Sequence, residues 1–170
     1  MRLSRAADDE AFTAFASSQS RALFRTAWLL TADWHLSEDL VQESLGRIYR
    51  AWGGIGRVDN PAGYAQTVLV RTFLSYRRRR SATERPSDHV LDTATAEPDH
   101  ALRMALVDAL ATLPKRDRAV LVLRYLDDRS VEQVAIDLGR SPGAIRVQSM
   151  RALARLRTAL GDADILKETR

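Results

Sequence analysis

The fold of the C-terminal part of this chain is decided by the stretch SVEQVAIDLGRSPGAIRVQS, residues 130–149. Ser130 followed three residues later by Gln133 is the signature of a capping box, which begins a helix. Gly139 ends that helix, and Ser141-Pro142 begins a second helix of about eighteen residues with an N-cap and a proline at the first helical position. Two helices joined by a glycine-containing turn predict a helix-turn-helix.

The second helix of this motif is the candidate DNA-contacting element. In a helix-turn-helix the second helix enters the major groove with its N-terminal residues toward the base edges. Polar and basic side chains follow its start, and we predict that they contact DNA: Ser141, Arg146, Gln148, Ser149, Arg151 and Arg155. Apolar side chains of the same helix are expected to face a core: Ile145, Leu153, Leu156 and Leu160. A helical hairpin that does not bind DNA is the alternative interpretation.

Upstream of the motif, helical spacing of apolar residues predicts two further helices. The first carries Leu102, Ala105, Leu106, Ala109 and Leu110 and ends at Leu113-Pro114, and the second carries Ala119, Leu121, Val122, Tyr125 and Leu126. Before them, residues 81–99 contain two prolines, five acids and a single arginine, without a sustained apolar period. This composition predicts a flexible acidic linker.

The first 80 residues also show helical spacing only. Apolar residues between Phe12 and Leu30 predict either a helical hairpin or one long helix that ends near residues 31–33. The next helix is expected to begin after Asp33, to carry Trp34, Val41, Leu45, Ile48, Tyr49 and Trp52 on one face, and to stop at Gly53-Gly54. Asn60-Pro61 then begins a helix with Ala65, Val68, Leu69, Phe73 and Tyr76 on one stripe, which we expect to run into four arginines at 77–80. The prediction is an all-α fold with two small helical domains, residues 8–80 and 100–161, joined by the linker 81–99.

Composition and charge narrow the possible functions. With no cysteine and three scattered histidines among 170 residues, we expect neither a disulfide framework nor a metal site, and no cofactor. Residues 1–80 and 101–170 each have a net charge of +4, whereas residues 81–100 have a net charge of −4. Two basic blocks beside an acidic spacer fit either an ordinary solvated surface or phosphate binding.

The sequence also lacks the signatures of an enzyme or a membrane protein. We find neither a nucleophile-base pair nor a glycine-rich phosphate loop, so we expect no catalytic residues. The N-terminus has no apolar signal region, and no window reaches the roughly 18 apolar residues that span a bilayer. A cytoplasmic protein without membrane insertion is therefore expected.

In their order along the chain, these motifs resemble the extracytoplasmic-function (ECF) sigma factors of bacterial RNA polymerase, especially an actinobacterial subgroup. DLVQE at residues 39–43, followed by Arg47, Tyr49 and Trp52, is similar to the family's region 2.2. NPAGY at residues 60–64, with Arg71, Phe73 and Arg77-Arg78, resembles regions 2.3 and 2.4. LPKRDRAVLVLR at residues 113–124 resembles region 4.1, and residues 130–157 resemble region 4.2.

The resemblance implies binding surfaces for core RNA polymerase and for promoter DNA. Region 2.2 implies docking on the clamp helices of the largest polymerase subunit through Asp39, Gln42, Glu43, Arg47, Arg50 and Trp52. Regions 2.3 and 2.4 imply recognition and melting of the minus-10 element through Arg57, Asp59, Asn60, Tyr64, Arg71, Tyr76, Arg77, Arg78, Arg79 and Arg80. Region 4 implies contact with the polymerase flap and recognition of the minus-35 element by the helix-turn-helix. The resemblance also implies that an anti-sigma protein is a common partner in the family, without assigning one to this chain.

Two stretches depart from the family pattern. The family often has Asn and Asp where Thr72 and Ser75 stand, and Thr-Val, a basic residue and Ser where residues 144–147 read AIRV. The alternative function is a stand-alone helix-turn-helix repressor or activator whose N-terminal half mediates dimerisation. Stoichiometric co-purification with core polymerase distinguishes the two hypotheses, because a stand-alone regulator does not bind the polymerase in that way.

Overall fold

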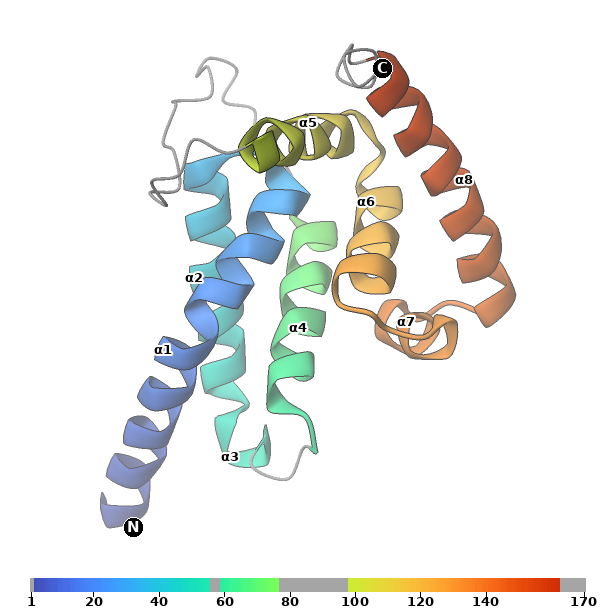
Figure 1. Ribbon diagram of the computed structural model, residues 1–170. Helices are drawn as coiled ribbons and strands as arrows, with labels where there is room; N and C mark the ends of the chain where they lie inside the picture. Colours follow the sequence, from blue (N-terminus) through green and yellow to red (C-terminus); the bar gives the residue numbers. More distant parts are fainter. Residues whose placement is uncertain (1, 56–58, 77–97, 163–170) are drawn as a thin grey trace. The chain divides into compact units, whose positions relative to one another are not determined.

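The computed structural model describes residues 2–55, 59–76 and 98–162, and every regular element in these ranges is a helix (Figure 1). The chain divides into two compact units, one made of Met1–Trp28 with His35–Arg78 and one made of Leu29–Trp34 with Arg79–Arg170. The predicted all-α fold of two helical parts is therefore confirmed. Within the described ranges no helix has the length and apolar character needed to cross a membrane. The predicted linker lies outside these ranges, apart from residues 98 and 99, which already belong to a helix.

The first unit begins with one long helix rather than a hairpin. Helix α1 spans Arg2–Thr31 without interruption, and Ala32 follows it with a positive φ of 54°. Helix α2 (Trp34–Arg50) begins directly after Asp33, as predicted. It buries Leu40, Val41 and Ile48 on one face, while Tyr49, which we expected on that face, is exposed.

The predicted stop of α2 at Gly53-Gly54 is wrong. Helix α2 ends at Arg50, and both glycines lie inside the short helix α3 (Trp52–Ile55). The Trp52 ring packs against two rings of α1, with centroid distances of 5.3 Å to Phe12 and 4.9 Å to Phe15. This aromatic packing holds the chain in one further helical turn where glycine alone favours a break.

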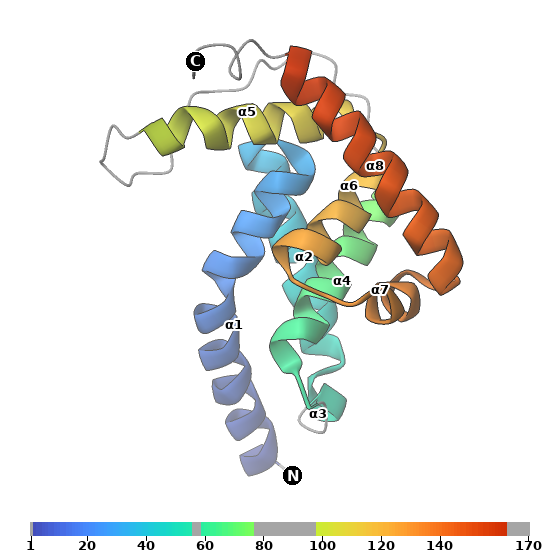
Figure 2. The same cartoon turned by 45° about the vertical axis from the view of Figure 1, so that its right-hand side comes forward.

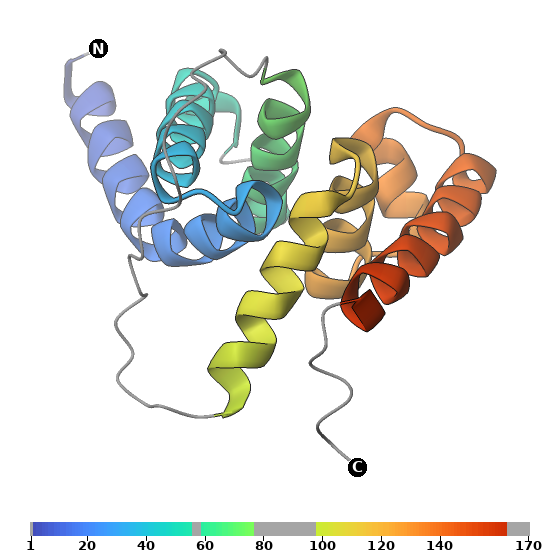
Figure 3. The same cartoon turned by 90° about the horizontal axis from the view of Figure 1, so that it is seen from above.

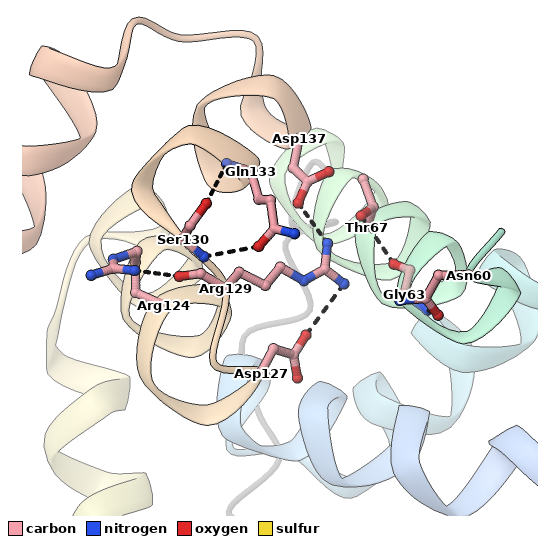
Figure 4. Close-up of polar contacts among 9 residues, drawn as sticks. All are labelled: Asn60, Gly63, Thr67, Arg124, Asp127, Arg129, Ser130, Gln133 and Asp137. Atoms are coloured by element: carbon pink, nitrogen blue, oxygen red, sulfur yellow. Dashed lines mark hydrogen bonds and ion pairs between the residues drawn. The ribbon is translucent and has the colours of Figure 1, made fainter. Parts of the chain in front are cut away.

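Helix α4 spans Pro61–Ser75 and begins as the sequence predicts. The Asn60 side chain accepts a hydrogen bond from the Gly63 backbone N–H at 2.8 Å (Figure 4). Pro61 takes the first helical position. The helix ends at Ser75, however, and Tyr76 is extended, with ψ at 104°. The expected continuation into the arginines is therefore wrong. The Ser75 hydroxyl donates to the Thr72 carbonyl at 2.9 Å, a local bond that competes with the helical ladder.

Residues 98–162 of the second unit form four α-helices and a π-helical turn. These are α5 (Pro98–Thr112), α6 (Lys115–Leu121), the π-helix η1 (Val122–Leu126), α7 (Val131–Leu138) and α8 (Pro142–Asp162). Helix α8 packs against α5, α6 and α7 (Figures 2 and 3). Leu110, Leu113, Leu121 and Ala152 form the buried cluster at this junction. Leu153 and Leu156 pack against the cluster, as their helical spacing predicts.

The apolar stripe predicted from Ala119 to Leu126 is only partly confirmed: Ala119, Leu121 and Val122 are buried, but its last two residues are not. Tyr125 and Leu126 are half exposed, whereas Val120 and Leu123 are buried. The reason is the π-helix: the Asp127 N–H bonds to the Val122 carbonyl five residues earlier, at 3.0 Å. The wider turn rotates the following side chains away from the face that regular α-helical spacing predicts.

The turns that begin and end α7 are confirmed in detail. The Ser130 hydroxyl accepts from the Gln133 N–H at 3.1 Å and the Gln133 side chain accepts from the Ser130 N–H at 2.9 Å, which completes the capping box (Figure 4). Gly139 ends the helix in the left-handed conformation, with φ at 62°. The Ser141 hydroxyl then accepts from the Ala144 N–H at 3.2 Å and caps α8.

A cluster of charged side chains holds the segment between η1 and α7. The Arg129 guanidinium bonds Asp137 of α7 at 2.5 Å and lies 3.6 Å from Asp127, and Arg124 donates to the Arg129 carbonyl (Figure 4). The pKa of Asp127 is raised above its ordinary value, mainly because burial disfavours the charged carboxylate. The nearby Arg129 guanidinium opposes this shift, and the Asp137 carboxylate adds to it. The cluster ties the entry of the helix-turn-helix to its first helix.

Candidate nucleic-acid and protein-binding surfaces

The first turns of α8 present a mixed basic and apolar surface to solvent. Arg146, Val147, Met150 and Arg151 are all exposed, and Met150 is 70% exposed. Positions three and four residues apart share a face of a helix, so these four side chains form one continuous strip. We call it the outer face of α8. The buried stripe, which includes Ile145 and Ala152, lies on the other side of the helix.

Ser149, which we predicted to contact DNA, does not lie on this surface. Its residue is only 5% exposed, and its hydroxyl donates to the Ile145 carbonyl one turn earlier at 2.8 Å. Position 149 is four residues after Ile145 and three before Ala152, both fully buried. Helical geometry therefore places this polar residue within the apolar stripe.

Gln148 and Arg155 point toward helix α6. The Gln148 Nε2 donates to the Asp117 Oδ1 at 3.1 Å, and the Arg155 guanidinium donates to the Asp117 Oδ2. Asp117 is 5% exposed. Both predicted DNA-contacting residues are thus hydrogen-bonded within the protein and are not among the four residues that form the outer face of α8.

Arg146 has an acidic partner of a different kind. Its guanidinium lies 2.8 Å from the Glu132 carboxylate of α7, and the two side chains are 60% and 59% exposed. An exposed pair of this type contributes at most about 1 kcal/mol. Arg146 therefore loses little when it exchanges this carboxylate for an atom of a ligand.

Two residues of the outer face, Val147 and Met150, were missed by the sequence analysis. The residues predicted there are the polar side chains near the helix start, whereas these two are apolar. A usable signal existed, because both positions fall outside the stripe formed by Ile145, Ala152 and Leu156. Large apolar side chains that lie together on an exposed face commonly mark a binding site.

In the first unit, helix α2 presents a face of mixed charge. Asp39, Gln42, Arg47 and Arg50 are exposed, and Arg47 lies 2.6 Å from Glu43 one turn earlier. Trp52, which was predicted with this set, is half-buried against Phe12 and Phe15. Its ring serves packing within the unit, so the exposed face consists of the polar residues of α2.

The residues predicted to contact the minus-10 element are only partly described by the structure. Asp59, Asn60 and Arg71 are exposed, and Tyr64 and Tyr76 are half-buried. Arg57 and the arginines at 77–80 lie outside the described residues. Thr72 is buried, and its hydroxyl donates to the Val68 carbonyl at 2.7 Å. The polar group at this position therefore faces the helix backbone.

Neither described unit contains a group of three or more histidine, aspartate or glutamate side chains that could hold a metal ion. The charged clusters of the second unit are pairs or triads of arginine with carboxylates. Such side chains can bind a partner through charge and hydrogen bonds.

Comparison with known proteins identifies the family. A Sigma-70 region 2 model matches residues 15–83, and a Sigma-70, region 4 model matches residues 103–156. The RNA polymerase sigma-E factor of Streptomyces coelicolor is 34% identical over 158 residues, covering 91% of this chain and 88% of that protein. The sigma-E factor of Streptomyces avermitilis is 33% identical over 156 residues, covering 91% and 87%.

A relative from another genus matches almost end to end. The ECF RNA polymerase sigma factor SigL of Mycobacterium tuberculosis is 31% identical over 175 residues, covering 98% of this chain and 99% of that protein. Along the chain, the region 2 match comes before the region 4 match, and each covers helices of the structure. The chain therefore belongs to the ECF group of the sigma-70 family of RNA polymerase sigma factors.

Proposed function

We propose that this sigma factor binds core RNA polymerase through the charged face of α2 and contacts the minus-35 element of promoters through the outer face of α8. The observation that carries the second assignment is the charge of α8. From residue 142 to residue 161 this helix contains four arginines and no acid. The only acid of α8 is its last residue, Asp162, so the charges along the rest of the helix are all positive, and its start is exposed and capped. Such a helix suits phosphate binding and insertion into the major groove.

The outer face of α8 has side chains for both kinds of DNA contact. Phosphate contacts position a protein on DNA, and contacts to base edges specify the sequence. Arg146 lies near the helix start, where a guanidinium can bond both acceptors of a guanine edge. Val147 and Met150 supply apolar atoms suited to a thymine methyl group, and Arg151 supplies a cation for a phosphate.

The charged face of α2 suits a protein partner. Between Trp34 and Arg50 this helix carries three acids and two arginines, and Glu43 and Arg47 pair with each other. Such a mixed face is a poor ligand for the uniformly negative DNA backbone. Complementary charges on a partner protein steer its association and fix its orientation. We assign the clamp helices of the largest polymerase subunit as that partner.

The minus-10 element is assigned to the loop before α4 and to α4 itself. Half-buried Tyr64 and Tyr76 offer ring faces on which an unstacked base of the opened strand can stack, and exposed Arg71 supplies a cation. The arginines at 77–80 extend this basic character along the sequence. Sigma factors are transcription initiation factors, and we assign no catalytic step to the residues of this chain.

The site of action and the further partners follow from the same proposal. Core polymerase and promoter DNA place the protein in the cytoplasm, and an anti-sigma inhibitor would act by covering the polymerase-binding or DNA-binding surface. The alternative of a stand-alone regulator leaves the region 2 match over residues 15–83 unexplained.

Charge reversal on α2 tests the polymerase-binding surface. We expect Glu43→Lys and Arg47→Glu each to lower core affinity at least about tenfold, which corresponds to roughly 1.4 kcal/mol. The control is the double variant, because it restores the 43–47 ion pair with reversed polarity and so preserves the helix. The double variant should remain defective if the partner surface requires the native polarity. Wild-type core affinity in both single variants, measured by titration and run-off transcription, would contradict the assignment.

A further inference from the structure

Asp117 occupies an unusual position for an acidic residue in this chain. It lies in the first turn of α6 and is 5% exposed. Both of its carboxylate oxygens accept hydrogen bonds from α8, one from Gln148 at 3.1 Å and one from Arg155. A buried carboxylate without partners is costly, because water no longer solvates its charge. Asp117 is therefore satisfied within the protein only while both side chains of α8 point toward α6.

The spacing of the two partners explains how one carboxylate holds both. Gln148 and Arg155 are seven residues apart, which is about two helical turns, so they share a face of α8. Ile145, three residues before Gln148, and Ala152, which lies between the two along the helix, are fully buried. The face bonded to Asp117 is thus continuous with the buried stripe on one side, and on the other side it adjoins Arg151 of the outer face, three residues after Gln148 and four before Arg155.

We propose that Asp117 is a positioning residue that determines which side chains of α8 are available to promoter DNA. By holding Gln148 and Arg155 against α6, it restricts DNA contact to the outer face of α8. This inference rests on the proposed minus-35 function of α8. It assigns to α6 a part in promoter specificity without contact between α6 and the bases.

The consequence for DNA binding follows from the chemistry of the two partners. The Arg155 side chain is 54% exposed, so it can leave Asp117 without disrupting the core. Once released, its guanidinium is available to a phosphate, and such a contact strengthens binding to every sequence alike. Released Gln148 presents an amide that can bond an adenine edge. Asp117 therefore lowers non-specific affinity and sharpens the preference for one minus-35 sequence.

Asp117 also has a structural role, which the test must separate from the proposed one. A negative charge in the first turn of α6 interacts favourably with the helix dipole. Pro114, the N-cap residue, makes no side-chain capping bond. Replacing Asp117 is therefore expected to lower the thermal stability in any case. The salt dependence of DNA binding is the better measurement, because a purely structural role does not add a phosphate contact.

The experiment uses the full chain reconstituted with core polymerase, on promoter fragments with an intact or a scrambled minus-35 element. The proteins are wild type, Asp117→Asn, Arg155→Ala and the double variant. We expect Asp117→Asn to make the slope of log affinity against log salt concentration more negative by about one unit. Between 50 and 200 mM salt, the affinity of this variant should therefore fall by a factor roughly three to four times larger than that of wild type. The preference for the intact element should fall, and Arg155→Ala should abolish the change in slope.

Asp108→Asn is the matched control, because it removes the same charge from an exposed position on α5. A slope for Asp117→Asn equal to that of wild type or of Asp108→Asn would overturn the inference. So would an increase that persists in the double variant. If Asp117→Asn does not fold, Arg155→Ala alone decides: the inference requires a slope close to that of wild type, and a loss of one unit contradicts it. Wild-type holoenzyme that ignores the minus-35 element would instead refute the proposed function.

Discussion

The start and the middle of helix α8 each pair an arginine with a carboxylate, yet the two pairs have different properties. Arg146 pairs with Glu132, and both side chains are more than half exposed. Arg155 is exposed to a similar extent, but the side chain of its partner Asp117 is only 7% exposed. Separating an exposed ion pair costs little free energy, because water solvates both charges. Separating a buried acid from its partner costs much more, because the buried charge is then left unpaired. The burial of the acid, more than that of the arginine, decides which arginine is free to bind DNA.

The largest expected effect belongs to the start of α8. Arg146→Ala should cost about 1–3 kcal/mol in promoter binding and relax the preference at one minus-35 position, because the bidentate contact to a guanine is lost. The measurement is holoenzyme binding across a library of minus-35 variants. Glu132→Gln is the control, since it removes the exposed partner and leaves Arg146 intact. An unchanged sequence preference in Arg146→Ala would remove the distinction between the two arginines.

The turn that places the start of α8 is expected to give the next largest effect. Gly139→Ala should destabilise the protein by roughly 1–2 kcal/mol, because φ at this residue is 62°. The added methyl group itself meets no atom within 4 Å, so the cost reflects the backbone conformation alone. Gly143→Ala is the matched control in the first turn of α8, where the added Cβ also meets no atom within 4 Å.

The two glycines should respond with opposite signs in chemical or thermal unfolding. Alanine in place of glycine at a regular helical position stabilises by up to about 1 kcal/mol. Equal effects of Gly139→Ala and Gly143→Ala would mean that the left-handed turn does not hold the start of α8. The position of Arg146 at the start of α8 could then not be attributed to this turn.

Met150 tests whether the outer face includes apolar contacts. We expect Met150→Ala to cost about 1 kcal/mol on promoters with a thymine at the contacted position, which is at the low end of a single mismatch. Leu102→Ala on α5 is the control, because Leu102 is also exposed and apolar but lies on another helix of the same unit. Equal effects of the two substitutions in promoter binding would exclude Met150 from the DNA-contacting surface.

The smallest effect is expected for Ser149. Its hydroxyl bonds to a carbonyl of its own helix, and alanine leaves no buried donor unpaired while favouring the helix. Ser149→Ala should therefore change the free energy of unfolding by no more than about 0.5 kcal/mol and leave minus-35 preference unaltered. A shifted preference in the same promoter library would show that the buried stripe rotates toward DNA in the complex.

The local signals of the sequence were sufficient for much of the fold. The capping box at Ser130 and Gln133, the left-handed Gly139 and the caps at Asn60 and Ser141 all form as predicted. Each depends on a side chain and a backbone group within four residues, so the chain outside the motif has little influence on it. The order of motifs was likewise sufficient to indicate the family.

The tertiary structure decided which polar side chains of α8 are available. Arg146, Gln148, Ser149 and Arg155 look alike as candidates in the sequence, yet only Arg146 lies on the outer face. The others face Asp117 or the buried stripe, and Asp117 is 31 residues before Gln148 and 38 before Arg155. The sequence also did not predict the π-helical turn or the early end of α4. Both depart from the regular period of 3.6 residues on which the prediction of helices depends. Caps and turns follow from neighbours in sequence, whereas the direction of a side chain follows from the elements that pack against its helix.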